Sequence, residues 1–140
     1  MSARILPAVD DLSRPFWDAA ARKTLAIQHC DRCQHFWHLP VYVCPTCRRG
    51  DALAWVEVSG RGKVYSYIVI RESRNEFVKT RLPLVVACVE LVEQAGLRLF
   101  ANILEVPHSE VTVDMDVKVA FEDLGNGLVL PQFVSLRNSN

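Results

Sequence analysis

Apolar and polar residues alternate along most of the chain after residue 52, which is the pattern of half-buried β-strands. The first alternating run is LAWVEVSGRGKVYSYIVIRES, and PLVVACVELVE, LRLFANILEV, DVKVAFED and LVLPQFVSL follow, separated by turn residues such as GNG. Strict alternation in the first run predicts two faces, with Val64, Ser66, Ile68 and Ile70 on one and Tyr65, Tyr67, Val69 and Arg71 on the other.

About five strands therefore occupy this part of the chain, with almost no helical periodicity among them. Five short strands leave unpaired edges unless the sheet closes on itself. We expect a small five-stranded barrel of the oligonucleotide/oligosaccharide-binding (OB) type, with a small β-sandwich as the alternative.

A short helix is predicted near the N-terminus, in the segment DDLSRPFWDAAARK. Asp, Ser and Pro stand where a helix begins, alanines follow, and basic residues close the segment. Its Phe16 and Trp17 are large for an exposed turn, so we expect them to pack against the rest of the chain or against a partner.

Two CxxC pairs lie in HCDRCQHFWHLPVYVCPTCRRG, with ten residues between the pairs. Each CxxC turn presents two sulfurs, and two such turns complete the tetrahedral shell that zinc prefers. The spacing predicts a zinc site formed by Cys30, Cys33, Cys44 and Cys47. We accordingly divide the chain into a helix and zinc module at residues 1–50 and a barrel at residues 51–140.

Four thiolates leave no open coordination position, so the zinc is expected to be structural. The neighbouring His29, His35 and His38 are expected to lie at the surface or to support the site without binding the metal. Cys88 lies inside a strand-like run and is expected to be a small buried residue. No phosphate-binding loop, GxSxG or HExxH motif occurs, so the residues favour a binding or scaffolding protein over an enzyme.

Charge and composition narrow the function further. Lys+Arg and Asp+Glu are equal at 16 each, which argues against general nucleic-acid binding. Residues 61–81, however, contain six basic and only two acidic side chains. The start of the chain lacks the apolar core of a signal peptide, and no apolar run approaches the roughly 20 residues that span a bilayer. We expect a soluble cytoplasmic protein, where paired cysteines bind metals more often than they form disulfides.

The chain resembles the zinc-ribbon/OB-fold acyl-CoA-associated proteins, long known as a domain of unknown function. The resemblance spans nearly the whole chain and is carried by PFWDAAARKTLAIQHCDRC, LPVYVCPTC, LAWVEVSGRGKVYSYIVI, LPLVVACVEL and a VKVAFE strand before LVLPQF. One departure is that Gln34 and His35 follow the first CxxC, where the family often has glycine.

The resemblance implies an N-terminal helix, a rubredoxin-like zinc ribbon and a C-terminal OB barrel, with no catalytic residues in the chain itself. It also implies a partner: a thiolase-fold enzyme of acyl-CoA condensation, acyl transfer or retro-aldol cleavage, or a hydratase-fold enzyme. Steroid side-chain degradation uses such an assembly. The partner, or a coenzyme A thioester, is expected to contact basic and aromatic residues, namely Arg61, Lys63, Arg71, Arg74, Phe16, Trp17, Phe36 and Trp37.

Two other functions are compatible with the sequence. Ribbon plus OB architecture, with Tyr65 and Tyr67 as stacking residues, fits a single-stranded nucleic-acid binder, although the zero net charge argues against it. A stand-alone acyl-CoA enzyme would have to use Asn102, Glu105 and His108, whose ordinary roles are in turns and on the surface.

Overall fold

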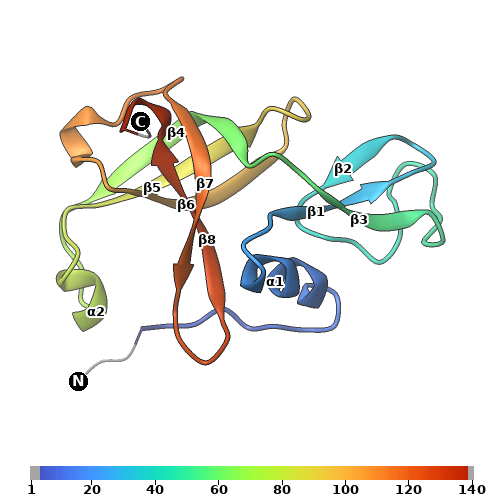
Figure 1. Cartoon of the computed structure of the whole chain (residues 1–140), viewed down its shortest axis with the longest axis horizontal. Helices are drawn as coiled ribbons and strands as arrows, with labels where there is room; N and C mark the ends of the chain where they lie inside the picture. Colours follow the sequence, from blue (N-terminus) through green and yellow to red (C-terminus); the bar gives the residue numbers. More distant parts are fainter. Residues whose placement is uncertain (1–3, 139–140) are drawn as a thin grey trace.

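The computed structural model describes residues 4–138 and places one helix and a small sheet beside a closed barrel (Figure 1). The elements are α1 (Arg14–Ala21), β1 (Ala26–Cys30), β2 (His35–Trp37), β3 (Leu53–Glu57), β4 (Arg61–Ile70), α2 (Glu76–Lys79), β5 (Leu84–Leu91), β6 (Arg98–Leu104), η1 (His108–Glu110), β7 (Asp116–Asp123), β8 (Val129–Ser135) and η2 (Leu136–Asn138).

Helix α1 is the predicted N-terminal helix, and its start is fixed by a reciprocal pair of hydrogen bonds. The Ser13 N–H donates to the Asp10 carboxylate at 2.7 Å, and the Asp10 N–H donates to the Ser13 hydroxyl at 3.2 Å. Proline stands in the first helical turn, where its missing N–H has no partner to lose. Ala19 and Ala20 are buried, and their small side chains let the helix pack closely against β1 and β8.

The small sheet is antiparallel, with strand order β2-β1-β3. Strand β3 pairs with β1 from Ala26–Glu57 to Cys30–Leu53, so it belongs to this sheet and not to the barrel in which the alternation placed it. The reason is that Ser59 and Gly60 interrupt the run: Gly60 has a positive φ of 79°, and the chain turns there before β4 begins.

The five-stranded closed barrel has the order β4-β5-β6-β8-β7, and β4 closes it by pairing with β7. The predicted mainly β architecture with a five-stranded barrel is therefore confirmed, and the sandwich alternative is wrong. All barrel pairs are antiparallel except β6 with β8, which pair in parallel over only two residues of each strand. Closure thus depends on a short contact that side chains must supplement.

A β-bulge in β4 changes which side chains face the core. The register of β4 against β5 shifts between Val64 and Ser66, which inserts an extra residue there. Val64 is buried, yet Ile68 on the predicted same face is 62% exposed, and Tyr67 packs against the core instead. The strict alternation expected for this strand is therefore wrong beyond residue 64.

One hydrophobic core serves both modules. Leu25 precedes β1 and Ile27 lies on it, yet both belong to the same buried cluster as Val89 of β5 and Phe133 of β8. Phe16 of α1 and Phe36 of β2 pack against this cluster from outside. Helix, small sheet and barrel are therefore joined by continuous apolar packing.

A glutamine amide adds a polar connection between the small sheet and the barrel. Gln94 lies in the turn between β5 and β6. Its Oε1 accepts from the Phe36 N–H at 2.8 Å, and its Nε2 donates to the Phe36 carbonyl at 3.1 Å. One side chain therefore satisfies both backbone groups of Phe36, as a neighbouring strand would.

Replacing Gln94 with leucine, which is similar in size but has no amide, should destabilise the chain by about 1–3 kcal/mol, because both backbone groups of Phe36 lose their partners. Hydrogen exchange at the Phe36 amide should accelerate more than exchange at Val89 in the barrel. Gln34→Leu is the control, since Gln34 is exposed and bonds only within its own turn. Unchanged protection at Phe36 would contradict this role of Gln94.

Candidate metal centre and neighbouring surfaces

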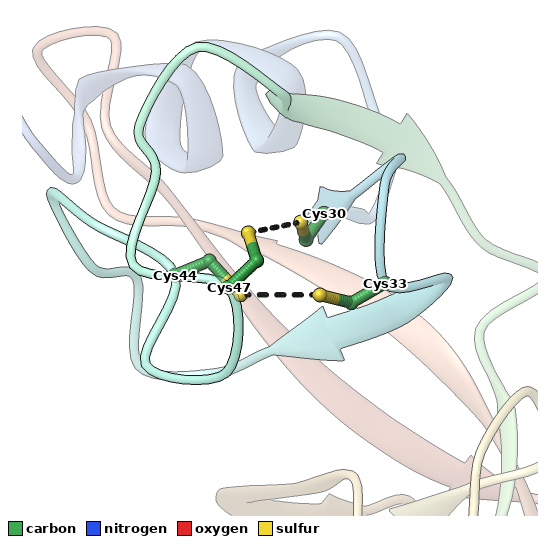
Figure 2. A group of neighbouring side chains, drawn as sticks. All are labelled: Cys30, Cys33, Cys44 and Cys47. Carbon is green, nitrogen blue, oxygen red and sulfur yellow. Dashed lines mark hydrogen bonds between the residues drawn. The ribbon is translucent and has the colours of Figure 1, made fainter.

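Four cysteine sulfurs converge at one end of the small sheet (Figure 2). Cys30 ends β1, Cys33 lies in the turn that follows, and Cys44 and Cys47 come from the loop before β3. The Sγ atoms of Cys30 and Cys47 lie 3.8 Å apart, as do those of Cys33 and Cys44, and all four lie within 4.8 Å of one another.

These distances fit a tetrahedral zinc site. Zn–S bonds of about 2.3 Å in a tetrahedron place the sulfurs about 3.8 Å apart. Cys30 and Cys44 are fully buried, so the cluster is also protected from water. With zinc bound, all four coordination positions would be taken by protein ligands, and the metal would hold together a module with little core of its own.

The residue after each CxxC has a left-handed backbone. Gln34 follows Cys33 with φ 54°, and Arg48 follows Cys47 with φ 62°. The Gln34 side chain donates to the Asp31 carbonyl at 2.5 Å, which helps to hold that turn. The turn therefore forms without glycine at this place, although a residue with a Cβ costs about 1–2 kcal/mol in this conformation.

The four thiols differ in acidity. The backbone N–H of Cys47, aided by that of Thr46, lowers the pKa of the Cys44 thiol to about 6, although burial opposes this. Burial, followed by hydrogen bonding to Cys47 and Cys44, raises the pKa of the Cys33 thiol to about 12. The site therefore carries its own hydrogen-bond donors for thiolate, aimed chiefly at Cys44.

The histidines of this region contact other groups. His29 Nδ1 lies 2.8 Å from the Asp31 carboxylate. The His35 ring packs at a tilt against Trp37, with 4.5 Å between ring centroids, and His38 lies beside Phe16. In the described part of the chain, the group close enough to hold a metal consists of the four cysteines alone. Cys88 is buried in β5, away from this cluster, and burial raises the pKa of its thiol.

A charged cluster ties the N-terminal segment to the barrel. Arg4 and Arg81 both bind the Glu122 carboxylate of β7, at 2.9 and 3.0 Å, and both guanidinium groups lie over the ring of Phe77 in α2. Figure 1 shows the N-terminal segment crossing the β7–β8 hairpin near its tip, on the side of the barrel where α2 lies. The pKa of Glu122 falls to about 2: burial alone would raise it, but hydrogen bonds from Arg4, Gln132 and Arg81 outweigh burial.

Gln132 extends this cluster into the gap between β6 and β8. Gln132 is 1% exposed, and its Oε1 accepts from the Asn102 backbone N–H at 2.6 Å. Its Nε2 donates to the side-chain Oδ1 of Asn102 at 3.1 Å and to the Glu122 carboxylate at 3.2 Å. Asn102 donates in turn to the Val85 carbonyl at 2.8 Å. These polar side chains supplement the short β6–β8 pairing, so their role is to close the barrel.

Two family models match the chain. The rubredoxin-like zinc ribbon domain of ChsH2 matches residues 17–54, and the C-terminal OB-fold domain of ChsH2 matches residues 55–122. A DUF35 domain-containing scaffold protein of Methanocaldococcus jannaschii is 32% identical over 104 residues, which cover 71% of this chain and 72% of that protein. The chain belongs to the DUF35 family. The predicted zinc ribbon, its zinc cofactor and the OB fold are confirmed by these matches together with the cysteine cluster.

Two further similarities of this DUF35 chain bear on assembly. The structure of an Ltp2-ChsH2(DUF35) aldolase matches with a TM-score of 0.83 and 32% identity, over 93% of this chain and 98% of the matched one. A probable enoyl-CoA hydratase alpha subunit of Thermomonospora curvata is 34% identical over 129 residues. The DUF35 chain spans only 38% of the length of that relative.

The predicted basic contact residues lie at two separate places on the DUF35 chain. Arg61 and Lys63 begin β4, whereas Arg71 and Arg74 follow its end. Seven strand residues lie between Lys63 and Arg71, which places the two pairs about 26 Å apart along the strand, so one phosphate group cannot contact both. Lys63 binds Asp116 at 3.0 Å. Within residues 4–138, Arg61, Arg71 and Arg74 form no ion pair.

The predicted aromatic contact residues also have different surroundings. Phe16 and Phe36 pack against the core, so much of their surface is used within the DUF35 chain. Trp17 meets Phe16 edge to face at 5.0 Å and lines a surface groove. Trp37 packs at a tilt against His35, and its buried Nε1 finds no hydrogen-bond partner in the described residues.

Phe100 and Leu39 are among the large exposed apolar side chains that sequence reasoning did not single out. Phe100 of β6 is 79% exposed and Leu39, after β2, is 75% exposed. The exposure of Phe100 could have been predicted from the alternation in this strand, because Leu97, Leu99 and Ile103 point into the core and Phe100 lies on the opposite face.

The two tyrosines considered for nucleic-acid binding lie on different faces of β4. Tyr67 faces inward, while Tyr65 faces out under Arg98, so they do not form the stacking pair that a nucleic-acid binder would use. None of the helices between residues 4 and 138 is long and apolar enough to cross a bilayer.

Proposed function

We propose that this chain is a non-catalytic accessory subunit that binds and stabilises a thiolase-fold acyl-CoA enzyme of condensation, acyl transfer or retro-aldol cleavage. The similarity to the Ltp2-ChsH2(DUF35) aldolase carries this proposal, because it extends over 98% of the matched chain at 32% identity. The word scaffold in the names of the archaeal relatives supports the same role.

The chemistry within the chain supports a structural contribution. The cysteine cluster offers a closed set of four sulfur ligands, with no position left for a substrate. The strongest charged cluster, around Glu122, is satisfied by Arg4, Arg81 and Gln132 and serves to hold the barrel. Both features stabilise the fold, so the reacting groups would come from the partner.

The partner and substrate can be proposed in more detail. The name of the Thermomonospora curvata relative also makes a hydratase-fold enzyme a candidate partner. An aldolase assembly of this kind fits the cleavage of a steroid side chain held as a coenzyme A thioester. Arg71 and Arg74, exposed and without an ion pair in residues 4–138, are the candidate contacts for its phosphates.

Co-expression with an Ltp2-type aldolase subunit tests this function. We expect one complex on size-exclusion chromatography, and a partner that is more soluble and more active than when it is expressed alone. The chain alone should cleave no acyl-CoA substrate. Separate elution at micromolar concentration, with a partner fully active by itself, would contradict the proposal.

A further inference from the structure

The outer surface of β4, β5 and β6 carries two large exposed apolar side chains, Ile68 and Phe100. Ile68 of β4 lies opposite Val86 of β5, which is half-buried, and Cys88 of β5, which is buried, lies opposite Phe100 of β6. These side chains form a diagonal apolar stripe whose exposed ends are Ile68 and Phe100. Ile68 is 62% exposed and Phe100 is 79% exposed. The stripe itself contains no charged side chain.

The stripe continues into a groove where helix, ribbon and barrel meet. The groove has a volume of about 170 Å³, and its walls include Phe16, Trp17, His38, Leu39, Phe100 and Pro131. Phe100 belongs to both the stripe and the groove, which makes the two features continuous. A cavity of about 150 Å³ accommodates benzene, so the groove has room for one large apolar side chain of a partner.

We propose that this docking face, formed by Ile68, Val86, Phe100, Leu39 and Trp17, is where the partner acyl-CoA enzyme binds. The inference rests on the proposed function. Residues of this size present about 200 Å² when fully exposed, so Phe100, Leu39 and Ile68 together expose on the order of 400 Å². That is about the apolar share of the roughly 800 Å² that each protein contributes to a standard interface.

The charges at one end of the docking face favour a different protein over a second copy of this chain. Arg71 and Arg74 follow the end of β4 three and six residues after Ile68, and both are exposed. Neither forms an ion pair within residues 4–138. A two-fold symmetric pair of copies centred on this face would place the two arginines of one copy against the groove of the other, whose lining residues include no acidic side chain. The partner expected here has an apolar centre, with at least one large side chain that enters the groove. Opposite the two arginines it presents negative charge, supplied by the phosphates of its coenzyme A thioester or by acidic side chains.

Affinity measurements with the purified Ltp2-type aldolase subunit test the docking face. Phe100→Asp should weaken binding at least 100-fold, and the milder Phe100→Ala about 10-fold or more, because Phe100 lies at the centre of the face. The matched control is Val113→Asp. Val113 is 55% exposed but precedes β7, which pairs with β4 on the side away from β5. The Val113→Asp variant should bind the aldolase subunit with a dissociation constant within about threefold of that of the original chain.

Zinc content and circular dichroism must first show that the variants fold, so that lost binding reports on the surface. If the original chain binds the aldolase subunit and both Phe100 variants bind it equally well, the docking face is not the binding site, while the proposed function stands. Failure of the original chain to bind would overturn both. Sedimentation that shows self-association lost in Phe100→Asp, with aldolase binding retained, would assign the face to a second copy and overturn the proposal.

Discussion

Replacing Cys30 with serine should leave the chain without its zinc and prevent it from accumulating as folded protein. Cys30 is fully buried at the end of β1, and its sulfur lies 3.8 Å from that of Cys47. Structural zinc contributes about 10–16 kcal/mol to small finger modules, which is as large as the net stability of about 5–15 kcal/mol of a whole domain. Because β1 also carries Ile27 into the shared core, loss of the ribbon should extend to the barrel.

The measurement is zinc per chain by atomic absorption, together with the yield of soluble protein. The original chain should contain about one zinc, and removal with a strong chelator should lower its unfolding temperature sharply. Cys88→Ser is the matched control, because Cys88 is also buried but lies in β5 outside the cluster. The Cys88→Ser variant should retain its zinc, and its free energy of unfolding should fall by only about 1 kcal/mol. Folded Cys30→Ser protein with a full complement of zinc would contradict the assignment.

Glu122→Gln should destabilise the chain by about 3 kcal/mol at pH 7. The side chain is 17% exposed and binds two arginines, so the substitution leaves Arg4 and Arg81 without their countercharge. The magnitude follows from the pKa, which is lowered from 4.5 to about 2, at about 1.4 kcal/mol for each unit. Glu90→Gln is the control: Glu90 binds Arg98 at 3.1 Å in a more exposed pair, which should contribute less than about 1 kcal/mol.

The pH dependence separates this charge effect from simple packing. A carboxyl group with a lowered pKa in the folded state stabilises fully above its unfolded pKa, and this stabilisation is lost as the pH falls through the folded pKa. The difference in unfolding free energy between the original chain and Glu122→Gln should therefore be constant above about pH 5.5 and shrink between pH 4.5 and about 2. Urea unfolding at a series of pH values measures it. A difference independent of pH would show that packing, and not charge, holds Glu122.

The parts of the molecule that follow from local sequence were predictable. The two CxxC pairs specify the ribbon because each turn orients its own two sulfurs, and α1 follows from Ser13 and Pro15 at its start. The bulge between Val64 and Ser66 was not predictable, because an extra unpaired residue in the strand leaves an alternating sequence looking regular. The pairing of β3 with β1 likewise depends on a partner strand that lies before it in the chain.

The long-range polar contacts could not be predicted from the sequence for a different reason. Arg4 and Glu122 are 118 residues apart, and Gln94 and Phe36 are 58 residues apart, so nothing in either local segment indicates its partner. Each of these side chains looks like an ordinary surface residue in the sequence. The basic residues 61–81 show the converse case, since proximity in sequence suggested one site that the length of β4 divides into two.

The two hydrogen bonds from Gln94 to Phe36 also bear on how quickly a partner can bind. They fix the ribbon against the barrel, and the groove beside Phe100 has walls from both modules. The surface is therefore assembled before any encounter, and little conformational freedom remains to be lost on binding. Association should then proceed in a single bimolecular step, limited by diffusion and orientation and without a slow rearrangement of modules.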